Sequence, residues 1–154
     1  ASTCISTGAV YMKNQAQKAS SKAKKALDES ARELEILAND VQQGLVSSPK
    51  KIEEAFARAH LALASNEHVR ATQSWTQKKY EQAGEALQSA NGHLEKSLNW
   101  TGGKIEKGTT DAMKKSNELA MKLKQKGSSI SEEAGKSLRD IGRSIDDFGK
   151  RISP

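Results

Sequence analysis

The sequence predicts an all-α fold, an antiparallel bundle of four to five helices. Three observations predict it: apolar residues recur at steps of three and four over long segments, the 154-residue chain holds only two prolines, and alanine is abundant. Large aliphatic residues are sparse, so each helix must pack against several neighbours or against other subunits. One helical domain is expected over residues 11–154, after an N-terminal arm at 1–10.

The residues of the arm are small and β-leaning, and the segment is too short to fold alone. It contains Cys4, the one cysteine, which is a candidate for a disulfide between two copies of the chain. A first helix is predicted over about 12–43, because an apolar face runs from Met12 to Val41 and Gly44 follows as a helix-ending glycine.

A second helix is predicted over 49–75, where Ser48 supplies the N-cap and Pro49 occupies the first turn. Its apolar residues form two faces, so the helix is expected to be surrounded by others. One face is Ile52, Phe56, Ala59 and Leu63, and the other is Ala57, Leu61, Ala64, His68, Ala71 and Trp75. The core is predicted to include Phe56, Leu61, Leu63, Trp75, Tyr80, Leu87, Leu94, Leu98 and Trp100.

A third helix is predicted over 79–99, after a turn at 76–79 that no glycine or proline marks. Trp75 followed by Tyr80-x-x-Ala83-Gly84-x-x-Leu87-x-x-Ala90 resembles the turn and second helix of a tetratricopeptide hairpin. The resemblance implies hairpin geometry over Ala71–Ala90. It implies no peptide-binding role, because the turn glycine is missing and the pattern does not recur.

The last two helices are predicted over 104–126 and 130–152. A lysine-rich end, Gly127 and the capping box Ser129-x-x-Glu132 indicate a break between them. The apolar phase continues across the join, so one long helix stays open as the alternative. The last helix combines heptad apolar positions with glycines every seven residues, which predicts a helix–helix seam within or between chains. The predicted interaction residues are Gly135, Gly142, Gly149, Ile141, Ile145, Phe148 and Ile152.

The net charge of +6 comes from 25 basic and 19 acidic residues, and lysine greatly outnumbers arginine. Lysine clusters suit diffuse attraction to an acidic surface better than bidentate phosphate or base recognition, and no aromatic residues interleave with them. A nucleic-acid partner is therefore not expected. The candidate basic patch is Lys13, Lys18, Lys22, Lys24, Lys25, Lys114, Lys115, Lys122, Lys124 and Lys126.

The sequence contains no catalytic signature. Of the three histidines, His60 and His68 are the candidates for metal ligands, but no His-Glu-x-x-His motif is present and neither a metal nor a cofactor is expected. No serine lies in a nucleophile elbow. No apolar run reaches the length of a membrane span, so a soluble or peripherally attached protein is expected.

A wider pattern consists of His60-Leu-Ala-Leu-Ala64, Trp75, Tyr80, Ala83-Gly84, His93-Leu-Glu95 and Trp100-Thr-Gly102. Its spacing resembles small exported bacterial all-helical proteins, such as the tubule-inducing subunit of nitrite oxidoreductase. The resemblance implies a subunit without catalytic residues that organises a larger redox assembly. Export to the periplasm or another extracytoplasmic compartment is expected, which agrees with a chain beginning at Ala1 without methionine.

The sequence therefore predicts a non-enzymatic structural or scaffolding protein that self-associates or bridges partner proteins through helical surfaces, for example in a filament. The alternative is an electrostatic binder of an anionic surface, a membrane or nucleic acid, through the lysine-rich helices.

Overall fold

A computed structural model describes residues 1–46, 48–102 and 107–152. This part of the chain contains six α-helices and no strand, which confirms the all-α prediction with more helices than the four to five expected. The helices are α1 (Ser2–Lys18), α2 (Ser21–Gln42), α3 (Pro49–Thr76), α4 (Tyr80–Trp100), α5 (Lys107–Lys126) and α6 (Ser131–Ile152), and a short 3₁₀ turn, η1 (Gly127–Ile130), joins the last two.

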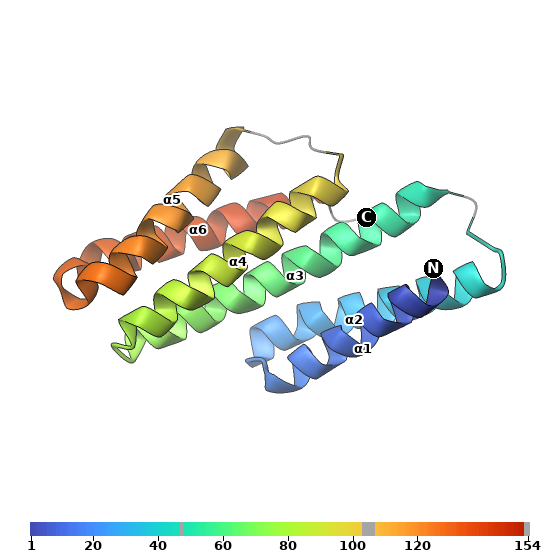
Figure 1. The fold of residues 1–154 in the computed structure, drawn as a ribbon, viewed down its shortest axis with the longest axis horizontal. Helices are drawn as coiled ribbons and strands as arrows, with labels where there is room; N and C mark the ends of the chain where they lie inside the picture. Colours follow the sequence, from blue (N-terminus) through green and yellow to red (C-terminus); the bar gives the residue numbers. More distant parts are fainter. Residues whose placement is uncertain (47, 103–106, 153–154) are drawn as a thin grey trace.

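The helices pair into three antiparallel hairpins, α1/α2, α3/α4 and α5/α6. Helix α3 packs against α2 on one side and α6 on the other, while α4 packs against α5. Figure 1 shows the hairpins side by side, with the turn of each directed toward the left of the view. The middle hairpin therefore holds the other two together.

The N-terminal part differs from the prediction. Residues 1–10, expected to form an arm, belong almost entirely to α1, and the helix expected over 12–43 is interrupted at Ala19 and Ser20, where the backbone is extended. In a single long helix over these residues, the apolar stripe of the N-terminal half would be exposed to solvent. Folding back at Ser20 buries Ile5 and Met12 of α1 against α2, which explains why the chain turns there.

The two apolar faces predicted for the second helix occur in α3, and each belongs to a different core cluster. Ile52, Phe56 and Leu63 pack with α1 and α2. Leu61, Ala64 and Trp75 pack with α4, α5 and α6. Helix α3 takes part in both clusters because it is apolar on most of its circumference, and such a helix must be covered on opposite sides.

The turn between α3 and α4 lies where it is predicted, although it lacks glycine. The amide of Lys79 donates to the carbonyl of Ser74 (2.8 Å) and that of Lys78 donates to Trp75 (2.9 Å), which is the Schellman pattern. Lys78 takes the left-handed conformation, with φ of 60°, that glycine usually supplies.

The break between α5 and α6 is also confirmed, so the alternative of one long helix is wrong. Gly127 has a positive φ of 44° and starts η1, and α6 begins at Ser131. Residues 104–106, with which the predicted fourth helix begins, lie outside the described residues. None of the described helices is long and apolar enough to cross a membrane.

Candidate functional site

The glycines of α6 form a seam with α3 inside the chain. Leu61, His68 and Trp75 of α3 are seven residues apart, and each lies over one glycine of α6. A Cβ at Gly135 would lie 2.7 Å from Cη2 of Trp75, and one at Gly149 would lie 3.2 Å from Cδ2 of Leu61. Matching heptads on antiparallel helices therefore let large residues of one helix enter the notches of the other.

The seam uses most of the residues predicted to contact a partner. Ile141, Ile145 and Phe148 are buried in the core shared by α3 to α6, and Ile152 packs against it. The glycines face α3. These residues are consequently occupied within one chain, and any surface for a partner must consist of other residues. The sequence pattern identified a helix–helix seam but not the helix that packs against the glycines. The seven-residue spacing of Leu61, His68 and Trp75 could have identified that helix as α3.

His68 belongs to this seam. Its Nε2 lies 2.6 Å from the carbonyl oxygen of Leu138, to which it donates as the neutral ring, and Gly142 makes room for the ring. Burial lowers the pKa of His68, an effect opposed by the hydrogen bond to Leu138 and by the charge of Asp146 and reinforced by that of Lys22. His68 thus fastens α6 to α3.

His60 and His93 form a separate pair, from α3 and α4. Their Nδ1 atoms are 3.3 Å apart and their rings stack with centroids separated by 5.6 Å. Burial, the neighbouring His93 and Lys96 together lower the pKa of His60 to about 4, and burial and Lys96 lower that of His93. Both rings are neutral at pH 7, so one donates to the other.

The structure does not bring the two predicted metal candidates together, because His60 pairs with His93 and His68 with a backbone carbonyl. Among the described residues no three His, Cys, Asp or Glu side chains come close enough to hold a metal ion. Cys4 is an exposed thiol on α1. The exposed position permits contact with a second copy, and the state of this thiol stays a prediction.

An open groove of about 600 Å³ lies between α2, α3 and α6. Its floor carries Arg58, whose Nε lies 3.0 and 3.1 Å from the two carboxylate oxygens of Glu33 and whose Nη1 donates to the carbonyl of Ile152 (3.1 Å). This fork ties α3 to α2 and to the end of α6, and the carboxylate raises the pKa of Arg58. The charged groups of Arg58 and Glu33 are therefore bonded to each other, and they stabilise the helix packing. They are not free to bind a ligand in the groove.

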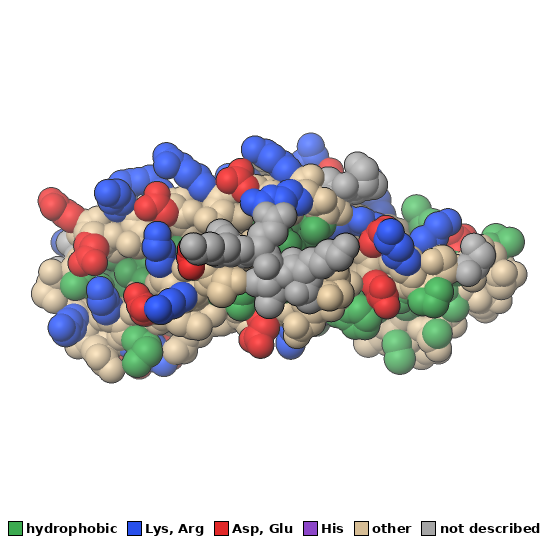
Figure 2. Space-filling model, turned by 90° about the horizontal axis from the view of Figure 1, so that it is seen from above, with side chains coloured by type: hydrophobic (Ala, Val, Ile, Leu, Met, Phe, Trp, Pro, Cys, Tyr) green, Lys and Arg blue, Asp and Glu red, His purple; other side chains and the backbone are tan. Residues whose placement is uncertain are grey.

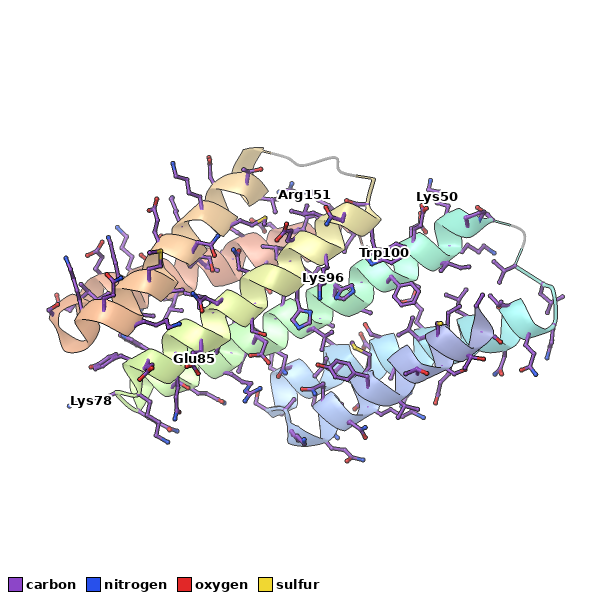
Figure 3. The ribbon with its side chains drawn as sticks, in the orientation of Figure 1. Lys50, Lys78, Glu85, Lys96, Trp100 and Arg151 are labelled. Atoms are coloured by element: carbon purple, nitrogen blue, oxygen red, sulfur yellow. The ribbon has the colours of Figure 1, made fainter. Side chains whose placement is uncertain are left out.

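Five of the nine predicted core residues are buried, three are partly buried, and Trp100 is exposed. It is 39 % exposed and stacks on Phe56, with ring centroids 5.0 Å apart, at the edge where α4 ends. Figure 3 shows Trp100 near Lys50 and Arg151, which border a shallow hollow of about 340 Å³. Trp75 and Tyr80 are only partly covered.

Seven of the ten lysines of the predicted basic patch lie at hairpin turns, and the other three lie elsewhere. All ten lysines are exposed, but Lys13 pairs with Glu35 across the first hairpin, and Lys114 and Lys115 lie midway along α5. The others lie near hairpin turns. Figure 2 shows basic and acidic side chains intermixed over the α5/α6 half of the molecule, with hydrophobic side chains more frequent at the opposite end.

One further surface was missed at the sequence level because α1 was read as an arm. Residues 1–12 carry no charged side chain, and the exposed residues of the first three turns of α1 include Thr3, Cys4, Thr7, Val10 and Tyr11. Val10 is 56 % and Tyr11 48 % exposed. We refer to these five residues as the α1 face.

No protein-family model, no curated protein and no solved structure matches this chain. Its classification therefore rests on the all-helical fold, and the resemblance to exported assembly-organising proteins stays a prediction.

Proposed function

We propose that the protein is a non-enzymatic structural protein that self-associates through the α1 face, and in this way organises a larger assembly. The observation that carries the proposal is the absence of charge from the first three turns of α1, where Val10 and Tyr11 are nonetheless exposed. Aromatic and aliphatic side chains without charged neighbours are typical of the centre of protein interfaces.

A second copy is the partner that the charges favour. Each chain carries +6, so two copies repel each other wherever basic surfaces approach. The α1 face lowers that penalty, since none of its five side chains is charged and the neighbouring Lys13, one turn beyond Val10, is paired with Glu35. Cys4 lies on the same face, which supports the predicted disulfide between copies as a secondary link. The resemblance to exported subunits that organise redox assemblies supports the same role.

Light scattering over a range of protein and salt concentrations tests the proposal. The unmodified protein is expected to associate as its concentration rises, and Val10→Lys to stay monomeric because it places a charge in the contact. Ile36→Lys is the matched control: Ile36 of α2 is also exposed, at 62 %, and lies outside the α1 face.

A folded protein that stays monomeric at every concentration would contradict the proposal. Equal association of the two lysine variants would show that another surface is used. Circular dichroism establishes that each variant has kept its helices.

A further inference from the structure

The hairpin turns form a second surface, distinct from the α1 face. The turns with their flanking residues, 18–25, 77–80 and 122–131, hold nine lysines and no acidic residue. The net charge of the whole chain is +6, and the three segments contribute +9. The rest of the chain therefore has a net charge of −3. We call these three segments the turn edge. Two glutamates, Glu81 and Glu132, follow the second and third segments directly. With both included the nine lysines still leave +7 at the turns, so the excess positive charge of the protein is concentrated there.

The fold collects the three segments on one edge of the molecule. Each hairpin reverses at its turn, and the connections between hairpins return at the other end, so the three turns follow one another along the left and lower-left edge in Figure 1. The first turn is set back from the other two, since Lys22 lies near enough to His68, well before the end of α3, to lower its pKa. In Figure 3, Lys78 extends from the free end of α3/α4 away from the helices.

More than half of these lysines are free to bind. Four have partners: Lys24 and Lys25 reach Asp28 and Glu29 at 3.9 and 4.0 Å, Lys122 reaches Glu133 at 3.5 Å, and Lys124 reaches the amide of Gln88 at 3.3 Å. Within the described residues, the remaining five make neither an ion pair nor a hydrogen bond through their side chains. They are Lys18, Lys22, Lys78, Lys79 and Lys126, all exposed.

We propose that the turn edge docks on the surface of an anionic lipid bilayer. The positive charges are lysines only, spread over three separate turns, which suits many dispersed headgroups better than one phosphate held bidentately. The intervening residues are small and polar apart from Ala19, Ala23, Leu123, Ile130 and Tyr80, so the contact is electrostatic and peripheral.

Nucleic acid is disfavoured by the same residues. The turn edge contains no arginine for reading base edges. Its one aromatic residue, Tyr80, packs over Gly127, where a Cβ would lie 3.3 Å from Cδ2, and so offers no face on which a base can stack.

Co-sedimentation with vesicles tests the proposal. The protein is expected to bind phosphatidylcholine vesicles that contain about a third phosphatidylserine and not pure phosphatidylcholine, and to dissociate between about 0.05 M and about 0.3 M NaCl. The edge variant replaces the five unpaired lysines with glutamine. Each lysine near an anionic membrane contributes about fivefold in affinity, so we expect a loss of at least about tenfold.

The matched control replaces Lys51, Lys96, Lys114, Lys115 and Lys136, which like the five edge lysines make no ion pair among the described residues, with glutamine. It removes the same charge from exposed positions outside the turn edge, so we expect it to bind within about threefold of the unmodified protein. Equal losses in the two variants would overturn the proposal, because net charge alone would then explain binding. So would failure to bind anionic vesicles, or binding to duplex DNA that exceeds binding to vesicles. Circular dichroism of both variants establishes that they are folded.

Discussion

Three side chains of α3 decide how the last helix docks. Leu61, His68 and Trp75 occupy the notches above Gly149, Gly142 and Gly135, and His68 adds a hydrogen bond to a backbone carbonyl of α6. Each glycine lowers helix propensity by about 1 kcal/mol, and close packing against α3 compensates for that cost. The glycines are therefore packing positions.

Replacing Gly142 by alanine is expected to destabilise the fold. A Cβ there would lie 2.7 Å from Cε1 and 3.2 Å from Nε2 of His68, so the ring must move and the bond to Leu138 is strained. Overpacking of about 1–3 kcal/mol outweighs the gain in helix propensity of about 1 kcal/mol. Urea unfolding followed by circular dichroism measures the difference.

Gly92→Ala is the control, because nothing lies within 4 Å of a Cβ at that position. We expect it to raise the free energy of unfolding by about 0.5–1 kcal/mol. Similar effects of the two substitutions would contradict the notch interpretation.

The histidine pair makes stability depend on pH. The folded protein lowers the pKa of His60 from 6.5 to about 4, so folding favours its neutral ring. This contribution is complete above pH 6.5, where the unfolded chain is also neutral, and is lost as pH falls from 6.5 toward 4. His60→Gln is expected to reduce the fall in unfolding free energy over that interval. Urea unfolding at several pH values measures it, and an unchanged pH profile would contradict the assignment.

At the scale of the element, α1 shows how a segment without obvious helix signals becomes a helix. Its intrinsic preference is modest, and it contains threonine, serine and Gly8. Its buried stripe of Ile5, Ala9, Met12 and Ala16 matches the stripe of α2, so tertiary contact stabilises it. The interpretation of residues 1–10 as an arm was wrong because their helix depends on packing against α2. The local sequence pattern of residues 1–10 does not show that contact.

Replacing Ile5 by alanine is expected to loosen the first hairpin selectively. Ile5 is 2 % exposed, and truncating a buried isoleucine costs about 2–5 kcal/mol. Hydrogen exchange of the α1 and α2 amides should accelerate, while exchange in α4 to α6, which belong to the other cluster, should change little. Gln17→Ala, at an exposed site on the same helix outside the α1 face, is the control and should have no effect. Uniform acceleration over the chain would contradict the separation of the two clusters.

At the scale of the whole molecule, α3 is the shared wall of two cores. The first hairpin covers one of its faces, and α4 and α6 cover the other, with α5 packed against both of them. The same stacking places the three turns along one edge and leaves α1 at the end of the row. Both proposed surfaces, the α1 face and the turn edge, are consequences of this arrangement.

The sequence by itself determined the helical class, the four later helices to within a few residues and the double-faced character of α3. It favoured a break at Gly127 but left one long helix open, and the structure decided between them. These features follow from periodicity, caps and glycines, which act over a few neighbouring residues. Only the tertiary structure decided that residues 2–18 form a helix, that the chain reverses at Ser20, and that the glycines of α6 face Leu61, His68 and Trp75. It also decided that His60 meets His93 and that three turns distant in sequence, each of which contains lysines, lie along one edge. These contacts join residues far apart along the chain, and their energy depends on which surfaces remain to be covered once the hairpins have formed.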